Sequence, residues 1–74
     1  MKENNFKYEV VKNIGVLKTS GNTTTEINLI SYNGAEPKYD IRKWDRVNDK
    51  MYKGITLSKE EVKILKLLLN NEDI

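Results

Sequence analysis

The chain has 74 residues and a formal net charge of +2, and it contains neither cysteine nor histidine. A domain this short buries only about 60% of the surface that its unfolded chain exposes. Neither disulfides nor a metal site built on Cys or His can stabilise the fold, so association of two copies is the remaining means of stabilisation. The missing thiol and imidazole groups also argue against catalysis, and we expect no enzyme, cofactor, metal or small-molecule substrate.

The sequence contains no segment typical of membranes or secretion. No apolar run approaches the roughly 20 residues that a membrane-spanning helix needs. The N-terminal residues Met1–Asn5 lack the apolar core of a signal peptide. We therefore expect a cytoplasmic protein without a membrane partner. Residues 1–74 are expected to form one domain, with residues 1–5 and 71–74 frayed.

The N-terminal half alternates between apolar and polar residues in the manner of β-strands. Residues 6–18 predict one long, bent strand or two short strands, with Gly15 as the interruption. The residues Thr19–Asn22 are typical of a tight turn, because Gly and Asn tolerate positive φ. A second strand is expected over residues 23–32.

A second hairpin and a fourth strand follow. Asn33-Gly34 is a strong hairpin signal and predicts that a strand beginning near Pro37 pairs antiparallel with the preceding one. The polar residues 45–50 indicate a loop, and residues 52–57 indicate a short strand. Gly54 predicts a β-bulge or a close approach of two backbones.

One helix is expected, from Lys59 to about Asn70. Ser58 is placed as its N-cap, with Glu61 three residues on, which is the pattern of a capping box. The apolar residues cover roughly 220° of the helix surface, more than the roughly 100° that one contact surface needs. We expect a two-fold related copy of the helix to cover the excess, the alternative being strands that curl around it. The residues concerned are Val62, Ile64, Leu65, Leu67, Leu68 and Leu69.

These elements predict an α+β fold, in which a curved four-stranded antiparallel sheet is followed by one C-terminal helix and two chains form a homodimer through their helices. The helix covers one face of the sheet, and the other face is left for a ligand. In the strand after Pro37, alternation puts Tyr39 and Ile41 on the packed face. The opposite, solvent-facing side then carries Lys38, Asp40, Arg42 and Trp44. Cations hold phosphates and a flat ring stacks on an unpaired base, so this side predicts binding of single-stranded nucleic acid.

The block Tyr39–Trp44, followed after a polar loop by Lys53–Ser58 and an amphipathic helix, resembles the transcriptional positive cofactor four family of single-stranded DNA-binding coactivators. The bacterial YdbC-like branch is the more similar one. The resemblance implies that the first block lies on a strand, that the second forms the last strand, and that the helix builds a homodimer.

The resemblance also implies site residues. Arg42 and Lys53 stand where family members place basic contacts to the DNA backbone, and Trp44 stands at the aromatic position that follows. The chain departs from eukaryotic members at Tyr32-Asn33-Gly34, where those members have an aromatic residue beside a basic one. The loop before Lys53 also lacks their glycine-rich, basic character.

Each candidate residue has a structural alternative. Arg42 either binds phosphate or forms a cross-strand ion pair, for example with Glu26. Trp44 and Tyr32 either stack on bases or close the edge of the core. Asp40, an acid on the proposed binding face, is expected to orient Arg42 or Lys38.

The remaining candidates are weaker. Lys38 and Lys18 either contact phosphates or are solvated surface lysines, and Asn28 either binds a base edge or pairs across the sheet. The full candidate set for nucleic-acid binding is Lys18, Asn28, Tyr32, Lys38, Arg42, Trp44 and Lys53.

The sequence therefore predicts a single-stranded DNA-binding protein of low sequence specificity that acts in transcription regulation or in DNA replication and repair, in the cytoplasm or at the nucleoid. Two alternatives stay open. One is a module for single-stranded RNA, which uses the same stacking and phosphate contacts. The other is a protein-interaction adaptor of the transcription machinery.

Overall fold

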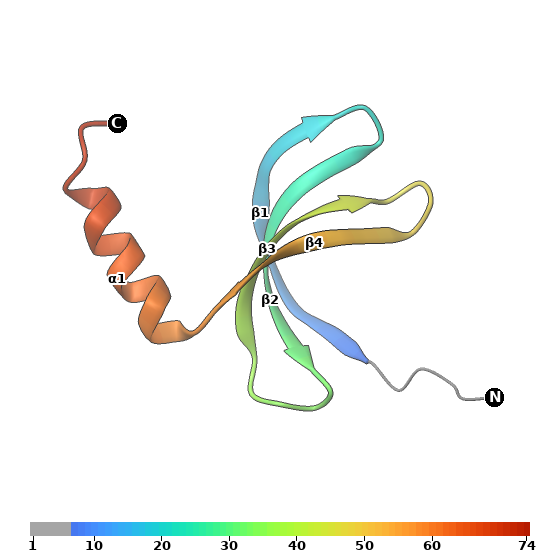
Figure 1. Cartoon of the computed structure of the whole chain (residues 1–74), viewed down its shortest axis with the longest axis horizontal. Coiled ribbons are helices and arrows are strands. Elements are labelled where there is room, and N and C mark those ends of the chain that lie inside the picture. Colours follow the sequence, from blue (N-terminus) through green and yellow to red (C-terminus); the bar gives the residue numbers. More distant parts are fainter. Residues whose placement is uncertain (1–6) are drawn as a thin grey trace.

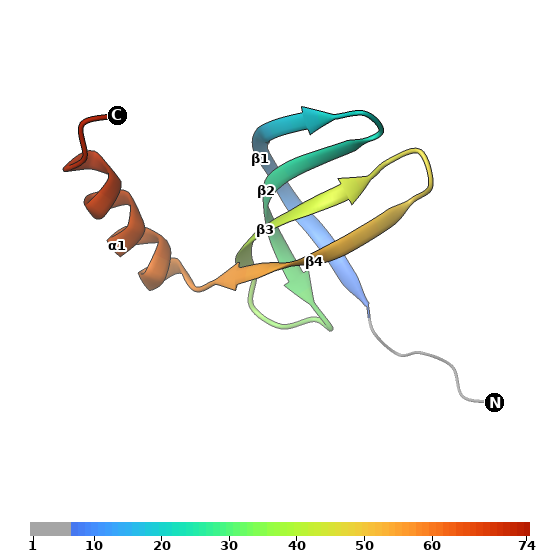
Figure 2. The same cartoon turned by 45° about the horizontal axis from the view of Figure 1, so that its top comes forward.

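The computed structural model describes residues 7–74 and contains one antiparallel sheet followed by one helix. The elements are β1 (Tyr8–Ser20), β2 (Thr23–Tyr32), β3 (Lys38–Asp45), β4 (Lys50–Leu57) and α1 (Lys59–Asn70). The strands lie side by side in the order β1-β2-β3-β4 (Figures 1 and 2). The predicted α+β class and element order are confirmed, whereas the predicted fraying of residues 1–5 lies outside the described residues.

The first strand is one long element, and its register against β2 shifts three times. At each shift β1 contains one residue more than β2, and these extra residues are Val11, Ile14 and Leu17. A bulge bends its strand and increases the local twist. The repeated bulges explain why β1 curves strongly along its length in Figure 1 and why Gly15 does not divide it into two strands.

Backbone conformation at two tight turns follows the sequence signals. Gly21, between β1 and β2, has φ +59°. After β2, Asn33 and Gly34 have φ values of 52° and 77°, which is the pairing that a type I′ turn requires. The Ala35 N–H donates to the Tyr32 carbonyl at 2.9 Å and closes this turn. Both predicted hairpins are confirmed.

Close packing of β4 against β3 depends on Gly54. A Cβ at this position would overlap the Cβ of Arg42 and the carbonyl oxygen of Ile41. Next to this glycine, Tyr52 and Lys53 lie opposite the single residue Lys43, so β4 carries a bulge. Gly54 therefore combines both roles that the sequence suggested, a bulge and a close approach of two backbones.

The two faces of the sheet differ in polarity and burial. The inner face carries Glu26, Asn28, Ile30, Asp40 and Trp44, all of which are buried. The outer face carries Ile27, Leu29, Ile41, Ile55 and Leu57, which are half-buried or exposed. The prediction that the side with Asp40 and Trp44 faces solvent is thus wrong for these two residues. The sheet curls toward the inner face and encloses the polar side chains there. Their polar atoms form hydrogen bonds with one another.

The helix begins and ends as predicted. Ser58 Oγ accepts from the Glu61 N–H at 3.1 Å, and the Ser58 N–H donates to the Glu61 carboxylate at 2.8 Å, which completes the capping box. Within one chain α1 contacts β3 and β4, and none of its residues is buried. Figure 1 shows the helix standing beyond the sheet, so the expected covering of a sheet face is not formed within one chain. Among residues 7–74, α1 is too short and too charged to span a bilayer.

Candidate nucleic-acid interface

Arg42 and Asp40 form a bidentate ion pair on the inner face of β3, in which Asp40 is fully buried and Arg42 half-buried. The Arg42 Nε and Nη2 atoms donate to the two carboxylate oxygens of Asp40, each at 2.6 Å, and Nη1 donates to the Tyr52 carbonyl at 3.0 Å. The Arg42 side chain is only 13% exposed. The prediction that Asp40 orients Arg42 is confirmed, and the alternative of an Arg42 ion pair with Glu26 is wrong. The expected exposure of this guanidinium is also wrong, because the Asp40 carboxylate draws it into the sheet.

Two hydroxyl groups complete the coordination of Asp40. The Tyr32 hydroxyl donates to Oδ2 at 2.7 Å, and the Thr56 hydroxyl donates to the same oxygen at 3.2 Å. Burial alone would raise the Asp40 pKa, but the bonds from Arg42, Tyr32 and Thr56 lower it below its ordinary value. Burial and the bond to Asp40 raise the pKa of Tyr32 to about 12. Tyr32 is therefore a neutral donor at physiological pH.

A second polar cluster lies further along the inner face, around the buried carboxylate of Glu26. Arg46 donates to it through Nη2 at 2.6 Å and Nε at 3.2 Å, and the Thr24 hydroxyl also donates to it. The Asn13 amide donates to Glu26 at 3.3 Å and to the side-chain oxygen of Asn28 at 2.6 Å. Burial raises the Glu26 pKa, and the bonds from Arg46, Thr24 and Asn28 outweigh it and lower the pKa overall.

Asn28 is fully buried within this cluster. Its amide donates to Glu26 and its oxygen accepts from Asn13, so its polar atoms serve the sheet itself. The structural alternative, pairing across the sheet, is the one observed. The prediction that this amide reaches a base edge requires an accessible side chain, and the structure does not provide one.

Trp44 is enclosed between its neighbours and is only 3% exposed. The guanidinium of Arg46 lies 4.3 Å from the centre of the indole ring, and the Tyr8 ring lies 6.0 Å away at a tilt. The indole N–H has no hydrogen-bond partner within residues 7–74. The prediction that this ring faces solvent is wrong, since Arg46 and Tyr8 cover it. Its part in binding stays a prediction.

The candidate lysines are all exposed but do not form one group. Lys38 lies opposite Ile30, on the inner-face side of β3. Lys53 sits in the β4 bulge, next to Tyr52, whose carbonyl holds Arg42. Lys18 lies opposite Thr25, which alternates to the outer face. The register therefore places Lys38 at the inner face, Lys18 on the outer face, and Lys53 in the bulge opposite the outer-face residue Lys43.

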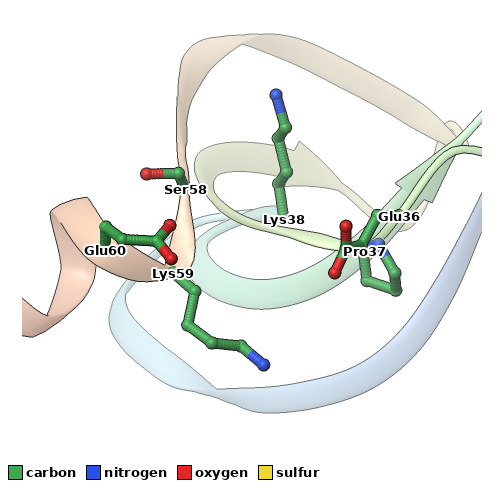
Figure 3. Close-up of a pocket in the computed structure, with 6 residues that line it drawn as sticks. All are labelled: Glu36, Pro37, Lys38, Ser58, Lys59 and Glu60. Carbon is green, nitrogen blue, oxygen red and sulfur yellow. The ribbon is translucent and has the colours of Figure 1, made fainter.

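A pocket of about 250 Å³ adjoins Lys38 at the start of α1 (Figure 3). The ammonium groups of Lys38 and Lys59 point in different directions in this view. Carboxylates of Glu36 and Glu60 line the same pocket. Because positive and negative groups alternate around it, the pocket is not an evident phosphate site.

Arg46 is the functional candidate that sequence reasoning missed. It lies in the turn between β3 and β4 and was grouped with the polar loop residues. Its partner Glu26 is 20 residues away along the chain. The local signal was its position two residues after Trp44, at the end of a strand that already carries Arg42.

Together, the curled four-stranded sheet, the carboxylate-held arginines at its inner face and the C-terminal helix define a small β-β-β-β-α domain. Residues 20–68 match the sequence model of the family described as Transcriptional Coactivator p15 (PC4). The chain belongs to this family, as the resemblance of residues 39–44 and 53–58 predicted. It is also 49% identical over 67 residues to an uncharacterized protein of Treponema pallidum (strain Nichols), and the match covers 89% of this chain and 79% of that protein.

Proposed function

We propose that the chain is a single-stranded DNA-binding protein of low sequence specificity that acts in transcription regulation, without catalysis, in the cytoplasm or at the nucleoid. The observation that carries this proposal is its membership of the coactivator family over residues 20–68, which include β2, β3, β4 and most of α1. The family resemblance implies single-strand binding for its members, and we propose the same activity for this chain.

The chemistry around the inner face supports the proposal. Exposed cations, Lys38 and Arg46, lie beside a face that carries the Tyr8, Tyr32 and Trp44 rings, and Lys53 adds an exposed cation in the β4 bulge. Cations neutralise phosphates, and planar groups stack on bases that a duplex keeps hidden. Neither contact reads base identity. Binding is therefore expected to favour single strands, to tolerate any sequence and to weaken as salt rises.

We further propose that the protein acts as a homodimer. Ile64, Leu67 and Leu68 of α1 are 57%, 64% and 61% exposed in one chain, and Ile55 on the outer face is 53% exposed. Large apolar patches of this kind mark association surfaces. A two-fold related copy places an identical apolar helix and sheet face opposite these residues. Two inner faces then point away from the shared interface.

Fluorescence anisotropy with a labelled oligothymidine of about 20 nucleotides tests the DNA proposal. We expect unlabelled single strands of DNA to compete effectively and a duplex of the same length to compete at least tenfold less well. A matched RNA oligonucleotide in the same assay separates DNA from RNA preference. Equal competition by single and double strands, or no binding at low salt, contradicts the proposal.

Lys53→Ala localises the interaction. Removal of one phosphate contact should weaken binding several-fold and reduce the slope of log K against log salt by about 1. Lys63→Ala on α1 is the matched control, because it removes the same charge from an exposed position away from the sheet. Equal effects of the two substitutions would show that net charge alone, and not a contact at the β4 bulge, attracts DNA.

A further inference from the structure

We propose that Arg46 supplies the stacking surface for an unpaired base and that the buried Trp44 ring serves as its backing. This inference rests on the proposed single-strand binding and assigns the planar contact to a residue that the sequence motif does not include. It also explains how a site with an enclosed tryptophan can still offer a flat surface to a nucleotide.

The Trp44 ring is not available for direct stacking. It is 3% exposed, with Arg46 at 4.3 Å from its centre and Tyr8 at 6.0 Å. A base that stacked on the indole would have to displace one of these groups. Displacing Arg46 would leave the buried Glu26 carboxylate without its ion-pair partner, which is costly.

Arg46 is held in place by two neighbours. Two of its nitrogen atoms donate to Glu26, at 2.6 and 3.2 Å, and its Cζ atom lies over the Trp44 ring, 4.3 Å from the ring centre, in a cation–π contact. The turn that carries Arg46 is fixed by the preceding residue, since Asp45 accepts hydrogen bonds from the Val47 and Asn48 N–H groups at 3.1 and 3.0 Å. A guanidinium restrained in this way loses little freedom when a ligand binds.

The Arg46 side chain is accessible to a ligand. The Arg46 side chain is 52% exposed although its carboxylate partner is only 5% exposed. Arg42, by contrast, is 13% exposed and has its Nε, Nη1 and Nη2 atoms engaged. Guanidinium planes stack on unpaired bases, and the positive charge also attracts the adjacent phosphate. Of the two arginines, the geometry therefore favours Arg46 as the base contact and Arg42 as a fixed part of the sheet.

The test compares Arg46→Lys with wild type on two ligands, an oligothymidine and an abasic oligonucleotide of the same length. Lysine keeps the charge and removes the plane. We expect the variant to bind oligothymidine about tenfold more weakly, to bind the abasic strand as wild type does, and to keep the wild-type salt slope. Lys43→Ala, an exposed cation opposite Thr25 on the outer face, is the control and should change neither affinity more than about twofold.

A second measurement uses the wild-type protein, so it does not depend on the variant folding. In NMR spectra the Arg46 Nε–H resonance should shift on addition of oligothymidine, because of the ring current of the base, and should shift much less with the abasic strand. Equal loss of affinity for both strands in Arg46→Lys, or an Arg46 Nε–H resonance that does not move while oligothymidine binds, overturns the inference. Absence of wild-type binding to either strand overturns the proposed function itself.

Discussion

The two faces of the sheet reverse the usual distribution of polar and apolar groups in a small domain. The inner face buries Glu26, Asn28 and Asp40 with their hydrogen-bond partners inside one chain. The outer face and α1 leave isoleucines and leucines exposed, among them Ile55 and Leu68. The polar region is thus complete within one chain, and the apolar region is not.

This difference indicates how the chain divides its tasks. Buried carboxylates are stable only when they are paired, and the pairs fix the arginines in defined positions. An apolar surface that stays exposed needs a partner of the same character. One region therefore holds the side chains of the proposed site in position, and the other provides the proposed association surface.

Asp40→Asn should have the largest effect on the polar region. It removes the charge that holds Arg42 and should lower the free energy of unfolding by about 3–5 kcal/mol, the usual cost of breaking a buried ion pair. Urea denaturation measures the change. Asp49→Asn is the control, because Asp49 is exposed with φ 53°, a conformation that Asn also tolerates, and it should change stability by less than about 0.5 kcal/mol. Similar losses in both variants would contradict a specific contribution of the Asp40 ion pair to the free energy of unfolding.

Leu68→Glu addresses the apolar region. The substitution removes an apolar contact from both copies of the proposed interface, and it should cost about 3 kcal/mol of association free energy, roughly a hundredfold in the dimer dissociation constant. Light scattering after size exclusion should give twice the 8.6 kDa chain mass for wild type and a shift toward the single-chain mass for the variant. Lys63→Glu, on the same helix, should remain dimeric. A wild-type protein that is monomeric at micromolar concentration contradicts the proposed association.

Gly54→Ala tests the packing of β4 against the strand that carries Arg42. Because the new Cβ overlaps Arg42 and the Ile41 carbonyl, we expect a loss of about 1–3 kcal/mol in the free energy of unfolding. Gly15→Ala is the matched control, since a Cβ at Gly15 meets no atom within 4 Å. Thermal or urea unfolding of the two variants should separate them clearly, and equal stability would contradict the close approach of the two strands.

Acid should act on the polar region selectively. The pKa values of Asp40 and Glu26 in the folded chain lie below their ordinary values of 3.8 and 4.5. The stability that these groups contribute is fully present above the ordinary values and is lost as the pH falls through the lowered folded-state pKa values. Urea midpoints should therefore be level from pH 7 to pH 6 and fall toward pH 3, with a shallower fall in Asp40→Asn. A level profile down to pH 3 contradicts this account.

The sequence predicted those features that depend on neighbouring residues. Ser58 with Glu61 specifies a helix start, and Asn33-Gly34 specifies a turn, because each signal acts within a few residues. The burial of Trp44 was one of two alternatives that the local pattern left open. It follows from the curl of the whole sheet, to which the bulges of β1 contribute, and from a guanidinium that arrives from the next turn.

The candidate site was predicted in part for the same reason. The Asp40–Arg42 pair could be predicted from the sequence because alternation places both residues on one side of a strand. The Arg46–Glu26 pair links residues on different elements, and nothing local to Arg46 identifies its partner. Exposure on the inner face was therefore overestimated for Arg42 and Trp44, and Arg46 was missed.

Amide NMR titration of the wild-type protein with a short oligothymidine reports DNA binding and its location on the sheet together. We expect shifts at Arg46, at Lys53 and at the indole N–H of the single tryptophan, Trp44, with the resonances of α1 nearly unchanged. Shifts concentrated on α1 and the outer face, or no shifts at low salt, would contradict this expectation.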